Sequence, residues 1–288
     1  MPPLRQRAPQ RVKVLGRRLS VAAGERTAGL RMTPSFVLAG AQRCGTTSLF
    51  RALVAHPSVL GPVHHKGVNY FDINYARGWA WYQGHFPLRS VARVRARSGA
   101  PVTFEASGYY AYHPHAATRL ARDLPDVKVV VMLRDPVERA YSAYKHERAR
   151  GFETEPFARA LALEDERVEA DLERMRADPD HAGFSHRHHS YRRRGQYAEQ
   201  LQRFVDLLGR DRLHVVDSAR FFAAPQEEFA RLTDFLGLAR HDGTAYDRWN
   251  ARPGTDMPVA AEATLRAALA PHDAALEELL AQRPSWCR

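Results

Sequence analysis

Short apolar runs alternate with amphipathic stretches along most of the chain. Four runs rich in valine and other β-forming residues occupy residues 36–39, 101–107, 127–133 and 212–217. Short, continuous apolar runs bounded by polar residues are typical of strands buried on both faces of a sheet. The stretches with helical periodicity are residues 48–57, 117–124, 136–151, 157–176, 195–209 and 225–238. This alternation predicts an α/β fold with a central parallel sheet flanked by helices.

One stretch breaks the alternation. Residues 178–195, "DPDHAGFSHRHHSYRRRG", are polar and show no period. Such a composition predicts a loop or a mobile segment.

Charge divides the chain into an arm and a domain. The net charge is +11, and the residues before Thr33 hold eight cations against Glu25, so +7 (8 − 1) lies in the arm and +4 (11 − 7) elsewhere. At 44% hydrophobic content, residues 34–288 can bury the core of a single domain. For the basic arm, residues 1–33, three behaviours are open: folding back, binding an anionic surface, or disorder.

The number of cysteines and the length of the apolar runs indicate the cellular compartment in which the protein is expected. Two cysteines, Cys44 and Cys287, do not make a disulfide framework, which fits a reducing setting. No apolar run approaches the roughly 18 residues of a membrane span, and the arm lacks the apolar core of a signal peptide. We therefore expect a soluble, cytoplasmic protein.

The stretch "GAQRCGTTS", residues 40–48, connects the first strand to the first helix. Its glycines have the spacing of a phosphate-binding P-loop, but Thr46 occupies the position of the lysine of nucleoside triphosphatases. N–H groups at a helix N-terminus and the helix dipole attract anions. The alternative is a chance pair of glycines in a strand-to-helix turn. The candidate phosphate-binding residues are Arg43, Cys44, Gly45, Thr46, Thr47 and Ser48.

A second candidate phosphate site follows the strand at 127–133. Arg134 stands at its carboxyl end, the edge at which open α/β sheets bind ligands, and Pro136 opens the next helix. Ser142 and His146 are four residues apart on that helix and share one face. Arg134 and the Ser142 hydroxyl would suit a phosphate, unless Arg134 simply pairs with a nearby acid.

Together the two motifs resemble the nucleotide signatures of the PAPS-dependent sulfotransferases. The first would bind the 5′-phosphosulfate and the second the 3′-phosphate of 3′-phosphoadenosine 5′-phosphosulfate (PAPS). Three later stretches resemble the heparan sulfate branch of this family, and the likeness covers roughly residues 34–288. These stretches are "NYFDINYARGWAWYQGHFP", "RRGQYAEQLQRF" and "NARPGTDMP".

This resemblance implies a fold and a reaction. The fold would be a single P-loop NTPase-like α/β domain. The reaction would move a sulfuryl group from PAPS to a hydroxyl or amine of a carbohydrate or glycan-like acceptor, with PAP as the product and no metal. Arg43 falls on the family's P-loop lysine and would stabilise charge, because a guanidinium keeps its proton. Arg134 and Ser142 would hold the 3′-phosphate, and Arg252 falls on the basic loop that covers the nucleotide.

The catalytic base is harder to carry over from the family. Gly67 stands where heparan-type members have a glutamate, although the neighbouring Lys66 and Asp72 match their pattern. His146 is the preferred base, since the N-sulfating branch has a histidine there and an imidazole titrates near neutral pH. The reserve candidates are His64, His65 and Asp72.

Two other hypotheses are a P-loop nucleotide kinase or NTPase and a non-catalytic polyanion-binding protein. The first would need the loop lysine and a magnesium-binding acid at the strand end, where Arg134 stands. The second rests on a charge that lies mostly in the arm. The histidines at 181–189 lack acidic or cysteine co-ligands, so no metal site is expected. We expect no nucleic-acid partner. The sequence does not choose between a glycan, a lipid and a small natural product as acceptor, nor an oligomeric state.

Overall fold

The computed structural model of the protein describes residues 20–97, 99–241, 246 and 256–287. Five strands form one all-parallel sheet in the order β2-β3-β1-β4-β5. The strands are β1 (Phe36–Gly40), β2 (Val59–Leu60), β3 (Val102–Glu105), β4 (Lys128–Leu133) and β5 (Leu213–Asp217). The central strands β1 and β4 are almost completely buried, as their continuous apolar runs predict. The predicted α/β fold with a central parallel sheet is confirmed.

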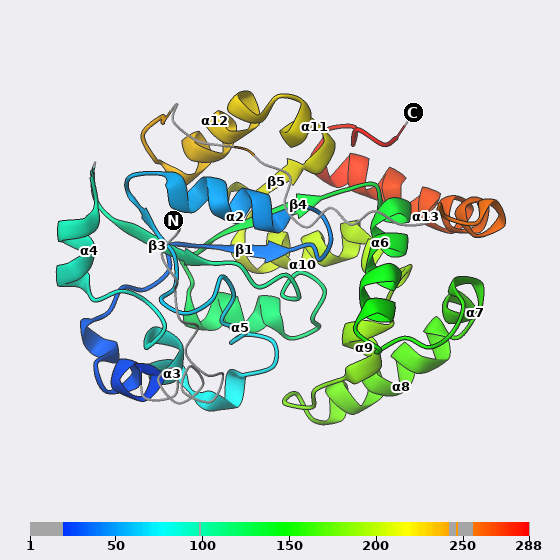
Figure 1. The fold of residues 1–288 in the computed structure, drawn as a ribbon, viewed down its shortest axis with the longest axis horizontal. Helices are drawn as coiled ribbons and strands as arrows, with labels where there is room; N and C mark the ends of the chain where they lie inside the picture. Colours follow the sequence, from blue (N-terminus) through cyan, green and yellow to red (C-terminus); the bar gives the residue numbers. More distant parts are fainter. Residues whose placement is uncertain (1–19, 98, 242–245, 247–255, 288) are drawn as a thin grey trace, which may run out of the picture.

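Helices cover both faces of the sheet (Figure 1). The helices are α2 (Thr46–Ala55), α3 (Trp79–Gln83), α4 (Arg89–Arg95), α5 (Ala116–Asp123), α6 (Pro136–Ala149), α7 (Phe157–Ala162), α8 (Glu164–Ala177), α9 (Phe184–His188), α10 (Tyr197–Leu208), α11 (Ser218–Ala223), α12 (Pro225–Leu236) and α13 (Val259–Leu280). Short 3₁₀ turns are η1 (Ala28–Leu30), η2 (Tyr75–Arg77), η3 (Arg193–Gly195) and η4 (Arg210–Arg212). In the part of the chain that the structure describes, no helix combines the length and the apolar character that a bilayer crossing requires.

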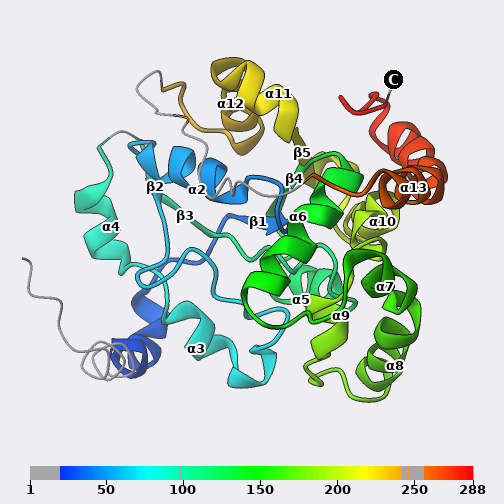
Figure 2. The same ribbon diagram turned by 45° about the vertical axis from the view of Figure 1, so that its right-hand side comes forward.

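The strand order creates a crevice at the carboxyl ends of β1 and β4. The chain leaves β1 through α2 towards β2 on one side of the sheet, and leaves β4 through α6 towards β5 on the other. Adjacent strands whose connections diverge in this way form the usual ligand-binding edge of an open α/β sheet. Both helices begin at this edge (Figure 2), so the two predicted phosphate motifs face the same crevice.

The polar stretch 178–195 is folded, and none of its residues from His186 on is exposed, which corrects the prediction of a loop or mobile segment. It contains α9 and η3. His186 Nδ1 lies 2.6 Å from the Tyr109 hydroxyl, and the Tyr112 hydroxyl donates to Ser190 Oγ at 3.0 Å. Hydrogen bonds to distant residues replace the apolar contacts of an ordinary core here, so the segment has no hydrophobic period.

The described part of the predicted arm packs on the domain. Residues 20–26 are helical and lead into η1. Arg31 Nη1 donates to Phe86 O at 2.6 Å, and Arg31 forms a β-bridge with Leu88. A Cβ at Gly24 would lie 2.3 Å from Gly84 O, so these backbones are in close contact. Residues 20–33 thus belong with the domain; residues 1–19 lie outside the described residues.

Candidate active site

The loop between β1 and α2 is shaped by two residues with positive φ. Arg43 has φ 72° and Gly45 has φ 99°, and a Cβ on Gly45 would lie 3.1 Å from the Phe222 ring. Glycine is therefore required at position 45. The Cys44 amide donates to Ala41 O at 3.3 Å and the Ser48 amide to Gly45 O at 2.9 Å. These two amides therefore donate hydrogen bonds within the loop, whereas the sequence predicted that they donate to an anion.

The first and second phosphate motifs are in contact. Arg43 Nε donates to Ser142 Oγ at 3.1 Å, although the two residues come from different strand–helix connections. Ser142 lies on α6 and is half-buried. The structure therefore brings the predicted 5′ and 3′ motifs into one crevice.

Arg134, the other member of the second motif, makes a surface ion pair. Its Nε and Nη2 donate to Glu138 Oε2 at 2.9 and 2.6 Å, and the two side chains are 38% and 53% exposed. This is the pairing with a nearby acid that the sequence left as the alternative. Exposed pairs contribute only about 0–1 kcal/mol, so a phosphate could displace Glu138 at little cost.

A lysine from outside the P-loop contacts its hydroxyl groups. Lys66 Nζ donates to Thr46 Oγ1 at 3.1 Å and to Thr47 Oγ1 at 3.2 Å. Burial lowers the pKa of Lys66 to about 8. A cation thus lies at the start of α2 even though the loop itself carries Thr46 in place of lysine.

The backbone around Lys66 is fixed to the end of β3. Ala106 N donates to Lys66 O at 2.7 Å, and Val68 N donates to Glu105 Oε2 at 2.7 Å. The Glu105 carboxylate also accepts from Ser107 Oγ at 2.6 Å and from the Tyr110 hydroxyl at 2.7 Å. Burial raises the pKa of Glu105. Sequence analysis did not identify Glu105 as the residue that positions Lys66.

Gly67 and Asp72 both bear on the choice of the catalytic base. The surroundings of Gly67 exclude a side chain, and the Asp72 carboxylate is buried and hydrogen-bonded. A Cβ at Gly67 would lie 2.6 Å from Ala106 O, so the position has no room for a side chain. Asp72 is 3% exposed and accepts from Asn69 Nδ2 at 2.8 Å and from Ile73 N at 2.7 Å. Burial raises the pKa of Asp72. Both oxygens of Asp72 are committed to shaping this turn.

Helix α6 also brings a buried carboxylate to the crevice. Glu147, next to His146, accepts from Gln42 Nε2 at 3.4 Å and from Arg150 Nη1 at 3.3 Å, and lies 3.1 Å from His188 Nδ1. Burial opposes its ionisation, but His188, Arg150 and His146 together hold its pKa below the ordinary value. No periodic pattern in the sequence pointed to Glu147, which links α6 to the P-loop residue Gln42.

Arg194 holds the other side of Gln42. Its Nη1 donates to Gln42 Oε1 and its Nη2 to Arg187 O at 2.8 Å. The guanidinium also lies over the rings of Tyr109 and Tyr112, 5.1 and 4.9 Å from their centroids. Residues 184–195 therefore pack directly against the P-loop.

The remaining candidates are placed as follows. Cys44 is buried, its Sγ lies 3.8 Å from the Tyr197 hydroxyl, and burial raises the pKa of its thiol. His64 and His65 are half-buried just before Lys66, and the His64 ring lies 6.4 Å from that of His85. Arg252 lies outside the described residues.

The histidines of 181–189 are bound to protein groups. His186 contacts Tyr109 and His188 contacts Glu147, while His189 Nε2 lies 2.9 Å from Phe152 O. Among the described residues, no group of three His, Cys, Asp or Glu side chains is arranged to hold a metal ion.

A parallel sheet with a P-loop-like turn at its switch point, and cations around that turn, defines an α/β protein of the P-loop type. The model of the sulfotransferase domain family matches residues 33–250, and the chain belongs to this family.

Relatives and solved structures agree with this family. The chain is 29% identical over 217 residues to mouse bifunctional heparan sulfate N-deacetylase/N-sulfotransferase 3, covering 72% of the chain and 23% of the relative. It is 31% identical over 240 residues to mouse heparan sulfate glucosamine 3-O-sulfotransferase 6, covering 82% and 60%. The crystal structure of a sulfotransferase from Alicyclobacillus acidocaldarius matches with a TM-score of 0.67 and 29% identity, over 89% of this chain and all of that one. The chain spans less than two thirds of either curated relative.

The crowding at Gly67 predicts that a glutamate cannot be restored there. Gly67→Glu should lower the free energy of unfolding by about 1–3 kcal/mol, because the added side chain must displace Ala106 O. Urea denaturation measures this difference. Gly29→Ala is the control, since a Cβ at Gly29 meets no atom within 4 Å. Equal stabilities of the Gly67→Glu variant and the wild type would contradict the crowding argument.

Proposed function

We propose that this protein is a PAPS-dependent sulfotransferase acting on a carbohydrate or glycan-like acceptor. The observation that carries the proposal is the convergence of Lys66 on Thr46 and Thr47 and of Arg43 on Ser142. These contacts gather two cations and three hydroxyls at the start of α2, where a helix N-terminus favours phosphate. Membership of the sulfotransferase domain family supports sulfuryl transfer as the chemistry.

The proposed mechanism is an in-line displacement. The acceptor oxygen or nitrogen forms a bond to sulfur while the bond from sulfur to the 5′-phosphate oxygen breaks. Arg43 and Lys66 neutralise the charge that develops on that leaving oxygen. Arg134 and Ser142 hold the 3′-phosphate and so fix the donor in line.

His146 is the proposed base. It lies one helical turn beyond Ser142 on α6, next to the buried Glu147. His146 would take the acceptor proton as the new bond to sulfur forms. Asp72 is less suited to this role, because both its oxygens accept hydrogen bonds within its own turn.

The acceptor class rests on the relatives. Two mouse relatives are named for heparan sulfate, one an N-sulfotransferase and one a glucosamine 3-O-sulfotransferase. An acceptor with amine or hydroxyl groups on a sugar ring is therefore the first choice. Incubation with ³⁵S-labelled PAPS and a panel of de-N-sulfated glycans, neutral oligosaccharides, lipids and small phenols tests this choice. Labelling of phenols but no sugar would exclude the carbohydrate assignment.

A nucleotide kinase is the competing hypothesis. Thermal stabilisation by adenosine 3′,5′-bisphosphate without metal, exceeding that by ATP with magnesium, supports the sulfotransferase. The reverse order would support a kinase.

The titration of Lys66 predicts a pH-dependent affinity for the donor nucleotide. Because the pKa of Lys66 is lowered to about 8, its ammonium is charged below that pH and neutral above it. Adenosine 3′,5′-bisphosphate should bind most tightly near pH 7 and several-fold more weakly at pH 9.5, as measured by calorimetry. Lys66→Arg should remove most of this dependence, because a guanidinium stays charged. An equal pH dependence in both proteins would assign the effect to another group.

Arg43 is expected to act on turnover more than on folding. Arg43→Ala should reduce kcat at least tenfold, because it removes charge stabilisation from the leaving phosphate. Its melting temperature should stay within a few degrees of the wild type. Arg174→Ala, an exposed residue on α8, serves as the control for loss of a charge. Full turnover in Arg43→Ala would show that Arg43 does not stabilise the leaving group.

His146→Ala tests the base. The variant should bind adenosine 3′,5′-bisphosphate normally but lose about 10²–10⁴-fold in kcat. The acidic limb of the pH–rate profile should disappear as well. An active variant with an unchanged profile would move the role to His65 or Asp72.

A further inference from the structure

A second basic surface lies away from the P-loop, around α4 at the β2 edge of the sheet. Between residues 26 and 122 the chain carries twelve Lys and Arg residues and two carboxylates. Both carboxylates, Asp72 and Glu105, are buried. Apart from Arg43 and Lys66 at the P-loop and the buried Arg119, the cations of this stretch are accompanied by no exposed carboxylate from the same stretch. The arginines of α4 and of the residues just after it are Arg89, Arg93, Arg95 and Arg97.

Exposed aliphatic side chains gather on the same stretch. Of the eight large hydrophobic side chains exposed in the described part of the chain, five lie between residues 30 and 94. They are Leu30 (63% exposed), Val54 (37%), Val63 (53%), Val91 (42%) and Val94 (87%). Apolar groups rimmed by polar ones mark interaction surfaces.

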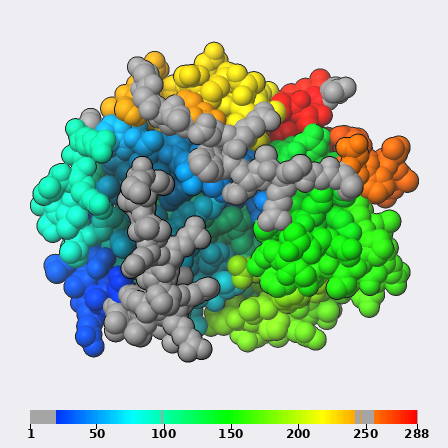
Figure 3. Space-filling model, viewed as in Figure 1, coloured from blue at the N-terminus to red at the C-terminus, as the bar shows by residue number. Residues whose placement is uncertain are grey.

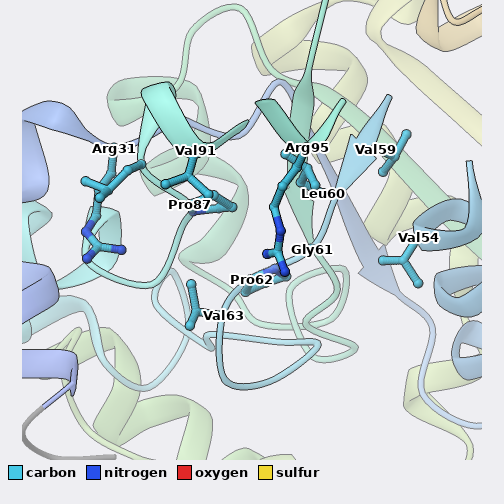
Figure 4. Close-up of a pocket in the computed structure, with 11 residues that line it drawn as sticks. Arg31, Val54, Val59, Leu60, Gly61, Pro62, Val63, Pro87, Val91 and Arg95 are labelled. Atoms are coloured by element: carbon cyan, nitrogen blue, oxygen red, sulfur yellow. The ribbon is translucent and has the colours of Figure 1, made fainter. Parts of the chain in front are cut away.

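Three of them, Val54, Val63 and Val91, line one groove of about 560 Å³ together with Arg31 and Arg95 (Figure 4). Arg89 Nη1 donates to Arg31 O at 2.8 Å and so ties α4 to the residue that follows η1. We call this surface the α4 face. It comprises the groove residues together with Leu30, Arg93 and Val94.

The acidic residues lie elsewhere on the molecule. Residues 147–180, which contain α7 and α8, carry eleven Asp and Glu residues and six Arg residues, a net charge of −5 (6 − 11). In Figures 1 and 2, and in the space-filling model drawn in the view of Figure 1 (Figure 3), α8 and α4 lie at opposite sides of the molecule. Such a separation of charge orients a protein on an anionic surface with its basic side inward.

We infer that the α4 face binds the surface of an anionic lipid bilayer. Its arginines would contact headgroup phosphates, and Leu30, Val63 and Val94 would enter the interface between headgroups and acyl chains. A polyanionic glycan would form ion pairs with the arginines, but it has no apolar surface against which the exposed valines could be buried. The aliphatic groups therefore favour a lipid surface. This inference does not depend on the sulfuryl-transfer activity.

Vesicle co-sedimentation of the full chain tests the inference. The probes are vesicles of phosphatidylcholine alone and of phosphatidylcholine with 30% phosphatidylglycerol, at 50 and 150 mM salt, without donor or acceptor. The wild type should bind the anionic vesicles at least tenfold more tightly, and less so at the higher salt. Both the double variant Arg93→Glu/Arg95→Glu and the variant Val94→Asp should lose about tenfold or more of this binding.

Matched controls separate the α4 face from the general effects of charge and of exposed valines. Val259 on α13 is 83% exposed, close to the 87% of Val94, so Val259→Asp should bind like the wild type. Arg174→Glu on α8 should do the same, and circular dichroism checks the fold of every variant. Wild-type binding by both α4-face variants would overturn the inference. Loss in the arginine variant but not in Val94→Asp, with binding to soluble heparin, would also overturn it and indicate a polyanion site.

Discussion

One buried carboxylate holds the phosphate-binding end of the molecule together. Glu105, at the end of β3, is completely buried and accepts hydrogen bonds from Val68 N, Ser107 Oγ and the Tyr110 hydroxyl. A buried charged acceptor deprived of such partners costs more than the 1–3 kcal/mol of a neutral group. The chain segment that carries Lys66 is therefore tied to the sheet, in the position from which Lys66 contacts Thr46 and Thr47.

A second set of contacts fixes helix α6 against the P-loop. The helix starts at a strong cap, where Asp135 accepts from Val137 N at 2.8 Å and Pro136 occupies the first turn. About two and three turns further on, Ser142 and Glu147 meet Arg43 and Gln42 of the loop. The loop follows β1 and the helix follows β4, so their contact depends on these two strands being neighbours in the sheet.

Local patterns predicted β1, β3, β4 and β5 and the turn that follows β1, but not β2, whose two residues form too short a run to recognise. The pairing of Lys66 with Thr46 and the role of Glu105 could not be predicted, since they join segments that only the folded sheet brings together. The stretch 178–195 was misjudged for a related reason: its polar groups are buried through single long-range hydrogen bonds, such as that between His186 and Tyr109. The catalytic roles of the site residues and the cytoplasmic setting stay predictions.

Whether a positively charged side chain can bind an anion depends on the protein group that it already contacts. Lys66 and Arg43 contact hydroxyl groups, which orient a cation without cancelling its charge. Arg167, in contrast, meets the buried Glu153 carboxylate at 3.1 Å and is neutralised in place. The carboxylates of residues 26–122 are Asp72 and Glu105, and both are buried. No exposed carboxylate of this stretch therefore reduces the positive potential at the P-loop. Eleven of the 32 Asp and Glu residues stand instead between residues 147 and 180. Of these, Glu147 contacts the P-loop residue Gln42, but the cations His188 and Arg150 offset its charge.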